Sequence, residues 1–283
     1  MWGFTTMSVW SAALLGLVQG IAEFLPISSS GHLSIINNLF RLSPLEQGHM
    51  LFDVLLHFAT LISILVVYWQ DVKEMFYEVL SFVNIGPLAG ERRAQYPGAR
   101  MFFMIIIATL PLFLILPIKD QLETLYYRNV FIGVSIILTG CILFVADRML
   151  PGKKTERTMR ISDALIIGLC QCVATIPGLS RSGTTITAGI ATGLKRDFAL
   201  RFSFLMSIPA VLGANILSLV DAFKSGVDWA SVPAYLVGMA VAMVSGVVSI
   251  NILKYITAKG RFGGFAYYCW VVGVLAIIMS VIF

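Results

Sequence analysis

Residues Gly16–Leu33 read GLVQGIAEFLPISSSGHL, and this stretch decides how the rest of the chain is interpreted. Apolar residues flank it on both sides, yet it contains Gln19, Glu23, three consecutive serines and His32. Each of these polar groups costs free energy in an apolar solvent unless it has a partner. The stretch therefore predicts a polar functional site inside an otherwise apolar protein.

The composition of the chain argues against a soluble globular protein. Of the 283 residues, 58% are hydrophobic and only 12% are charged, whereas soluble domains carry about 25% charged residues. We therefore predict a polytopic membrane protein. The net charge of +5 fits basic loops at one membrane face, and no basic and aromatic cluster indicates nucleic-acid binding. The four cysteines lie in apolar segments and predict no disulfide framework. Since the first basic residue is Arg41, a cleaved signal peptide is not expected.

Eight apolar regions organise the chain. Crossing a bilayer takes about 20 apolar residues in a helix, and six segments fit: residues 54–70, 101–118, 129–146, 202–220, 229–253 and 262–283. Two further regions, residues 9–40 and 161–194, are interrupted by Pro26 and Pro177 and by neighbouring glycine and serine. Irregular backbone at membrane depth is tolerated only where protein or water surrounds it. The pattern predicts an all-α polytopic membrane protein with six transmembrane helices and two re-entrant helix–loop–helix hairpins.

The two interrupted regions resemble each other. A shift of 152 positions places Gly16 on Gly168 and Gln19 on Gln171, and it also superimposes two serines and a glycine of the two loops. The downstream stretches FDVLLHFATL and FSFLMSIPAV look related as well. This indicates an internal duplication. We predict a single membrane domain, residues 1–283, built from repeat one, residues 1–150, and repeat two, residues 151–283.

The loop charges predict the orientation of these repeats. Basic residues gather in the linker 148–160, after the second hairpin, before the last span and after Gln70, and the positive-inside rule assigns these loops to the cytoplasm. With six spans, the second hairpin then enters from the cytoplasmic side and the first from the outer, periplasmic side. The repeats would have inverted topology, with both termini on the outer side. Residues Phe76–Ala89 are expected to form a cytoplasmic surface helix and loop.

The first hairpin carries groups suited to acid–base and anion chemistry. Gln19 and Glu23 are four residues apart and share a helix face, and the carboxylate could bind a divalent cation, take a proton or serve only as a structural, protonated acid. The serine–glycine turn over residues 28–31 could bind an anion with backbone N–H groups, although a single serine is more often a helix cap than a nucleophile. His32 could act as a general base, a general acid or a phosphoryl acceptor. His49 is interpreted as a loop residue and His57 as a packing or hydrogen-bonding residue.

The second hairpin supplies a cation. Its loop reads PGLSRSGTT, residues 177–185, and Arg181 stands among four hydroxyl side chains. A guanidinium at membrane depth costs at least about 2.5 kcal/mol unless it is paired, and its planar fork suits phosphate. Two hairpins entering from opposite faces could meet near the midplane. They would form one site for phosphate and a metal ion.

The motifs QGIAEFLPISSSGH and PGLSRSGTT closely resemble the two signature regions of the undecaprenyl-diphosphate phosphatase family, also called the bacitracin-resistance family. The resemblance extends over essentially the whole chain. It implies a multi-pass protein of the bacterial plasma (inner) membrane that hydrolyses undecaprenyl diphosphate to undecaprenyl phosphate and inorganic phosphate. That reaction recycles the lipid carrier for peptidoglycan and other cell-wall polymers and confers bacitracin resistance. A divalent cation, Mg²⁺ or alternatively Ca²⁺, is implied as cofactor. Shorter isoprenyl diphosphates are expected as substrates, and a homodimer is left open.

The resemblance also assigns roles to residues. The expected catalytic residues are Glu23, Ser29, His32 and Arg181. Glu23 would bind the metal, with Gln19 as a second candidate ligand; many family members have Glu at that position, so the role depends mainly on Glu23. The expected phosphate-binding residues are Ser28, Ser30, Gly31, Ser180, Arg181, Ser182 and Thr185.

Two questions stay open at the level of sequence. The attacking group is Ser29, His32 or a water molecule activated by Glu23. The alternative function is a transporter or flippase of an anionic isoprenoid lipid. Inverted repeats and broken helices are also typical of transporters. An acid and a histidine beside the serines favour the enzyme, since a carrier needs no acid–base pair.

Overall fold

The computed structural model describes residues 7–39, 50–82, 96–225, 228–260 and 262–282. Within those ranges the regular structure is helical, apart from one isolated bridge between Lys154 and Leu194, so the all-α prediction is confirmed. The helices of the first half are α1 (Val9–Phe24), α2 (Ser29–Leu39), α4 (Met50–Val67), α5 (Trp69–Ser81), α6 (Pro97–Thr109), η1 (Leu110–Leu114), η2 (Leu116–Ile118), α7 (Lys119–Glu123), η3 (Thr124–Tyr127) and α8 (Asn129–Arg148). Those of the second half are α9 (Ile161–Val173), α10 (Arg181–Ala191), α11 (Arg196–Ser225), η4 (Trp229–Ser231), α12 (Val232–Ala258) and α13 (Gly263–Ile282).

The long apolar helices confirm a multi-pass membrane protein. Among the described residues, five helical stretches are long and apolar enough to cross a membrane: Pro97–Tyr127, Asn129–Arg148, Arg196–Lys224, Trp229–Ala258 and Gly263–Ile282. A sixth is obtained when α4 and α5, which are bent by 79° at Tyr68, count as one span. The predicted segments 202–220 and 229–253 are too short, because the helices continue past the apolar core into polar and basic residues.

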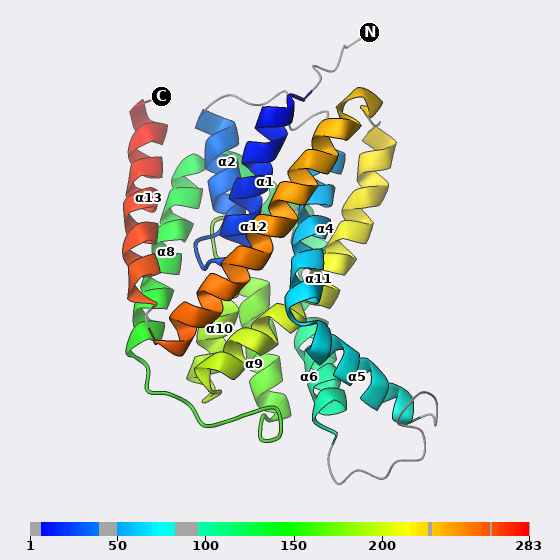
Figure 1. Ribbon diagram of the computed structural model, residues 1–283. Coiled ribbons are helices and arrows are strands. Elements are labelled where there is room, and N and C mark those ends of the chain that lie inside the picture. The colour runs from blue at the N-terminus through cyan, green and yellow to red at the C-terminus, as the bar shows by residue number, and fades with distance from the viewer. Residues whose placement is uncertain (1–6, 40–49, 83–95, 226–227, 261, 283) are drawn as a thin grey trace.

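The bend after α4 turns α5 out of the bundle (Figure 1). α5 is amphipathic: Met75 and Glu78 are buried, whereas Trp69 and Phe76 are exposed. The surface helix expected from residue 76 begins earlier, at Trp69, and ends at Ser81. Residues 83–89 of that prediction lie outside the described residues, as do residue 40 of the first hairpin and His49.

A proline lies in the break of each hairpin, as the sequence predicts, but most of the serine and glycine after it belongs to the next helix. α1 ends at Phe24, two residues before Pro26, and α2 begins at Ser29. α9 ends at Val173, and the chain passes Pro177 and a positive-φ Gly178 before α10 begins at Arg181. α1 starts at the end of the bundle where both termini lie, and α9 starts at the opposite end, so the hairpins extend towards each other (Figure 1).

Small residues bring α1 close to α12. A Cβ on Gly16 would lie 2.2 Å from the Gly238 carbonyl oxygen, and one on Gly20 would lie 2.1 Å from Ser245 Oγ and 2.4 Å from the Ala242 carbonyl oxygen. Such contacts let backbones approach closely, which is how helices associate in membranes. The glycine face of α1 therefore lies against α12. Gln19 and Glu23 are buried in the interior of the bundle.

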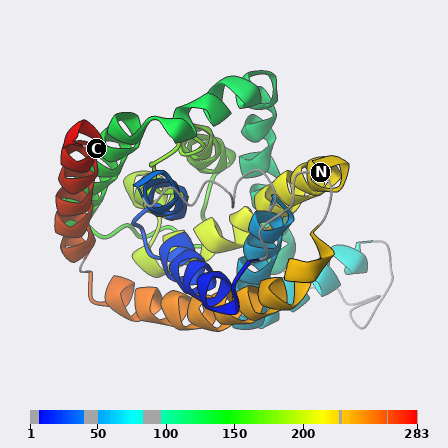
Figure 2. The same ribbon diagram turned by 90° about the horizontal axis from the view of Figure 1, so that it is seen from above.

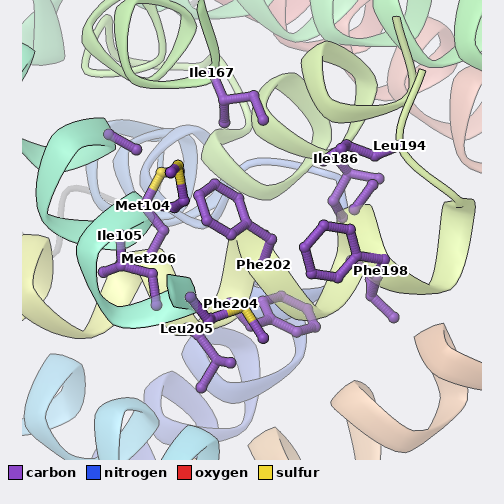
Figure 3. Close-up of a cluster of buried hydrophobic side chains, with 14 of the residues drawn as sticks. Met104, Ile105, Ile167, Ile186, Leu194, Phe198, Phe202, Phe204, Leu205 and Met206 are labelled. Carbon is purple, nitrogen blue, oxygen red and sulfur yellow. The ribbon is translucent and has the colours of Figure 1, made fainter. Parts of the chain in front are cut away.

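A core of buried side chains supports the second hairpin. It is centred on the first half of α11, where Phe202, Leu205 and Met206 are almost fully buried (Figure 3). Met104 of α6, Ile167 of α9 and Ile186 of α10 pack into the same cluster. Seen from above, the long helices form an outer wall around α2 and α10 (Figure 2). α10 is almost wholly buried, which holds the loop before it in a fixed position.

Candidate active site

The centre of the candidate site is an ion pair between the two hairpins. Arg181 Nη2 donates to Glu23 Oε1, across 158 positions of sequence. The other carboxylate oxygen, Glu23 Oε2, accepts from Ser29 Oγ at 2.7 Å. The side chain of Glu23 is 6% exposed and that of Arg181 is 26% exposed. Glu23, Ser29 and Arg181, three of the four expected catalytic residues, therefore meet directly.

Gln19 extends this cluster along α1. Its Nε2 donates to Glu23 Oε2 at 3.2 Å and to His57 Nδ1 of α4 at 3.1 Å. Because the Glu23 carboxylate can only accept, the Gln19 amide nitrogen faces these partners. The same geometry makes His57 Nδ1 an acceptor, 4.0 Å from Glu23 Oε2. Gln19 Oε1 is buried and has no hydrogen-bond partner in the described part of the chain.

The serine–glycine turn of the first hairpin acts mainly as a helix cap. Ser28 has a φ of 73°, the left-handed region that non-glycine residues rarely adopt, and its Oγ accepts from Gly31 N at 3.2 Å. Ser30 Oγ lies 3.4 Å from Ser28 Oγ and accepts from Gly178 N of the second hairpin at 3.5 Å. A side-chain hydrogen bond also joins Ser30 to Tyr126 of η3. Ser30 thus joins the two loops, whereas the hydroxyl of Ser28 and the amide of Gly31 satisfy the end of α2.

His32 faces away from the ion pair. Its Nδ1 donates to the Ser28 carbonyl oxygen at 2.8 Å, and its Nε2 then accepts from the Tyr268 hydroxyl at 2.8 Å. The two rings stack, with centroids 5.7 Å apart and planes within 6°. Both ring nitrogens are therefore occupied at the contact between α2 and α13. In the described part of the chain, neither hydrogen bond of His32 is to Glu23 or Arg181.

The hydroxyls of the second hairpin position Arg181 rather than surround it. Ser180 Oγ caps α10 by accepting from Gly183 N at 3.1 Å, and it lies 3.2 Å from Ser182 Oγ. Thr185 Oγ1 donates to the Arg181 carbonyl oxygen at 2.8 Å and lies 2.5 Å from Ser203 Oγ of α11. These bonds fix the first turn of α10, and so they fix the point from which Arg181 extends.

A small cavity adjoins the ion pair. It is lined by Glu23, Phe24, Arg181, Ser182, Ser203, Phe204 and Ser207, and about 10 Å³ of it is open to the centres of water molecules. That is room for about one water. The cavity as it stands is too small for a diphosphate.

The residues at this site could hold a cation only with help from a ligand. No group of three or more His, Cys, Asp or Glu side chains lies together in the residues that the structure describes. Glu23 offers one carboxylate, and the partnerless Gln19 Oε1 offers a hard amide oxygen. Mg²⁺ is commonly bound by one or two carboxylates with substrate phosphates completing the shell. The donors therefore fit a cation that is shared with a phosphorylated substrate.

His57, Ser203 and Ser207 are at the site, although motif reasoning did not select them. His57 was expected to be a packing or hydrogen-bonding residue; the hydrogen bond is confirmed, and its partner is Gln19 of the site. The signal was present in the related stretches after each hairpin. Aligned at Phe52 and Phe202, they place His57 on Ser207 and Asp53 on Ser203. Ser203 and Ser207 line the cavity, and His57, which aligns with Ser207, bonds to Gln19.

Comparison with known proteins gives a consistent result. A family model described as bacitracin resistance protein BacA matches residues 12–275. A protein of Methanosphaera stadtmanae named undecaprenyl-diphosphatase is 36% identical over 281 residues, covering 98% of this chain and 99% of that protein. A protein with the same name from Desulforapulum autotrophicum is 37% identical and covers 96% of this chain and 98% of its own length. Another, from Pelotomaculum thermopropionicum, is 38% identical and covers 97% of each chain. The similarity thus includes both hairpins and the long helices around them.

Proposed function

The chain belongs to the bacitracin resistance protein BacA family, and we propose that it is an integral membrane phosphatase hydrolysing undecaprenyl diphosphate to undecaprenyl phosphate and inorganic phosphate. The activity recycles the lipid carrier for peptidoglycan and other cell-wall polymers and confers bacitracin resistance. Shorter isoprenyl diphosphates are proposed as further substrates. The isoprenoid tail lies in the bilayer while the diphosphate reaches the loops of the two hairpins.

The observation that carries this proposal is the contact of Ser29 and Arg181 with the two oxygens of one buried carboxylate. An arginine fork binds phosphate in the geometry in which it binds a carboxylate. A diphosphate that pairs with Arg181 competes with Glu23 for the guanidinium. Binding of substrate therefore releases Glu23 from its counterion and raises its basicity towards Ser29.

We propose Ser29 as the attacking group, with Glu23 as its base. Ser29 Oγ attacks the terminal phosphorus, its proton passes to Glu23, and the bond from that phosphorus to the bridging oxygen breaks. The lipid leaves as the monophosphate, and Arg181 balances negative charge as it develops. Water then attacks the phosphoserine, giving a proton to the site as the Ser29 oxygen regains one, and inorganic phosphate is released. His32 supports the turn that presents Ser29, because its Nδ1 bonds to the Ser28 carbonyl.

A divalent cation, Mg²⁺ or alternatively Ca²⁺, is proposed as cofactor. Glu23 and Gln19 Oε1 would be its protein donors. The cation neutralises charge on the diphosphate when bound.

The orientation is proposed from the charges of the loops. The linker 149–160 lies at the end of the bundle opposite both termini (Figure 1). Its basic residues support a cytoplasmic position by the positive-inside rule. The termini and the mouth of the first hairpin would then be periplasmic. The opposite entry of the hairpins supports residues 1–150 and 151–283 as inverted repeats.

The test is phosphate release from farnesyl diphosphate by the purified full-length protein in detergent, with and without Mg²⁺. The unchanged chain is expected to release phosphate, and Glu23→Gln is expected to lose that activity while still folding, with a lower melting temperature because Arg181 loses its counterion. Asn251→Gln, on the exposed part of α12, is a matched control with an amide change away from the site. Absence of phosphate release with every divalent cation tried would refute the phosphatase and leave a lipid carrier as the explanation.

A further inference from the structure

Tyr126 brings a hydroxyl to the loop of the first hairpin. Its side chain is half-buried and hydrogen-bonded to Ser30, whereas the neighbouring Tyr127 is 67% exposed. η3, which carries Tyr126, also packs against α2. Pro111 and Pro117 lie in the short 3₁₀ turns that precede η3, so the chain reaches the loop by an irregular path rather than as a straight helix. η3 is thus a further element, besides the two hairpins, that contacts the serine loop.

Hydrogen bonds continue from Ser30 into the second hairpin. Ser30 Oγ accepts from Gly178 N at 3.5 Å, which is the longest and weakest bond of the series. The Gly178 carbonyl oxygen accepts at 3.3 Å from Thr139 Oγ1 of α8, which also donates to the Ser135 carbonyl oxygen of its own helix at 3.1 Å. The same Thr139 oxygen accepts from Ser180 N at 3.0 Å. Thr139 is almost fully buried, and α8 packs against both α2 and α10.

This series of hydrogen bonds contacts the neighbours of the proposed nucleophile and of the phosphate-binding cation. Ser29 directly precedes Ser30, and Arg181 directly follows Ser180. Ser28, on the other side of the nucleophile, has a φ of 73°, a conformation that is unfavourable for a non-glycine residue and persists only where surrounding contacts enforce it. The loop that presents Ser29 therefore depends on contacts from outside it to keep its shape.

We propose that Tyr126 and Thr139 are positioning residues that hold Ser29 and Arg181 at a fixed separation. The inference rests on the proposed function and adds two residues to it. Tyr126 acts through Ser30, and Thr139 acts through the backbone of the second loop, so neither has to touch the substrate. The terminal phosphorus has to meet the serine oxygen while its oxygens meet the guanidinium. A misplacement of about 1 Å can cost about 10²-fold in rate, so this separation affects kcat directly.

The first test compares Tyr126→Phe with Tyr127→Phe in the purified full-length protein, with farnesyl diphosphate as substrate. Each variant loses one phenol hydroxyl and keeps its ring, and Tyr127 is the exposed neighbour. Because only one of several contacts to the loop is lost, we expect Tyr126→Phe to lower kcat by about tenfold, with little change in KM and a small fall in melting temperature. Tyr127→Phe should match the unchanged chain.

The second test changes Thr139. Valine has the shape of threonine but removes the hydroxyl that bonds to the second loop, so both kcat and the melting temperature of Thr139→Val should fall. Thr139→Ser keeps the hydroxyl and should restore most of the rate. Thr109→Val is the matched control, because the Thr109 hydroxyl donates to a carbonyl oxygen four residues earlier in its own helix.

Amide hydrogen exchange over residues 178–180 reports the coupling between the loops without an activity assay. Exchange there should be faster in Tyr126→Phe than in Tyr127→Phe, although the phenol at position 126 bonds to the first loop. The double variant Tyr126→Phe with Thr139→Val gives a second readout. Its loss of kcat should be smaller than the product of the two single losses, because both residues act through one series of bonds.

Full kcat in Tyr126→Phe overturns the positioning role. So does unchanged exchange in the second loop of that variant, or a double variant whose loss equals the product of the single losses. Absence of phosphate release by the unchanged chain would instead refute the phosphatase, and with it the catalytic role of both residues, whatever the exchange measurement gives.

Discussion

Replacing Arg181 by alanine removes the charged partner that Glu23 has on the second hairpin. The carboxylate, 6% exposed, is then left without its counterion. Losing one partner of a buried ion pair costs about 3–5 kcal/mol. Two features favour the lower end of that range: Ser29 and Gln19 still donate to Glu23 Oε2, and Arg181 itself is 26% exposed. The expected loss of unfolding free energy is about 3 kcal/mol, a fall in Tm of roughly 6–12 °C.

The double variant Arg181→Ala with Glu23→Gln tests whether this loss comes from the stranded charge. A neutral amide needs no counterion, so most of the lost stability should return, with a coupling free energy within the range of about 0.5–3 kcal/mol seen for contacting residues. Activity should not return. Removing a donor that stabilises developing charge costs about 10²–10³-fold in kcat, and the double variant lacks the base as well. Arg181→Lys, which keeps the charge without the planar fork, is expected to lie between the unchanged chain and Arg181→Ala in phosphate release.

The assay pairs melting curves in detergent with phosphate release from farnesyl diphosphate. The reasoning would be refuted if Arg181→Ala had the same melting temperature as the unchanged chain. It would also be refuted if the double variant were no more stable than Arg181→Ala. Near wild-type phosphate release by Arg181→Ala would contradict the role of the guanidinium in binding phosphate.

Three further predictions follow from the same geometry. In Gly20→Val, new methyl groups meet Ser245 and the Ala242 carbonyl, so α1 must move from α12 and Tm should fall, in keeping with an overpacking cost of about 1–3 kcal/mol; an unchanged melting curve would contradict the close contact. Thr185→Val leaves the buried Ser203 hydroxyl without its 2.5 Å partner, at a cost of about 1–3 kcal/mol, and Thr185→Ser should restore the melting temperature. Gln19→Glu adds a second carboxylate beside Glu23, so the Mg²⁺ concentration for half-maximal phosphate release should fall; a rise would argue against Gln19 as a metal ligand.

Sequence reasoning located the residues whose position depends on local rules. Proline disfavours a helix interior, and both hairpins are broken at Pro26 and Pro177, although Pro209 lies inside the continuous helix α11. The costs of Glu23 and Arg181 in an apolar region required partners, and each is the partner of the other. These features follow from transfer free energies and backbone sterics, which a single sequence reveals.

Contacts between distant helices could not be predicted in the same way. His32 seemed the better functional histidine because it follows the serines, yet it pairs with Tyr268, 236 positions later. His57 seemed isolated in an apolar span, yet α4 brings it to Gln19. The neighbouring helices decide which face of a transmembrane helix is buried in the bundle. When a helix is apolar on all sides, its sequence does not indicate that face. No proline or glycine lies beside the 79° bend at Tyr68, so this bend could not be predicted from the sequence.

The most direct test of the central claim is phosphate release from undecaprenyl diphosphate by the unchanged chain and by Ser29→Ala, both purified at full length. The serine hydroxyl bonds to Glu23 at 2.7 Å and faces the base that it needs. The account predicts one inorganic phosphate for each lipid monophosphate formed by the unchanged chain. It predicts a loss of about 10³-fold or more in kcat for Ser29→Ala, with the melting temperature nearly retained. Phosphate release by Ser29→Ala at a rate close to that of the unchanged chain would contradict it.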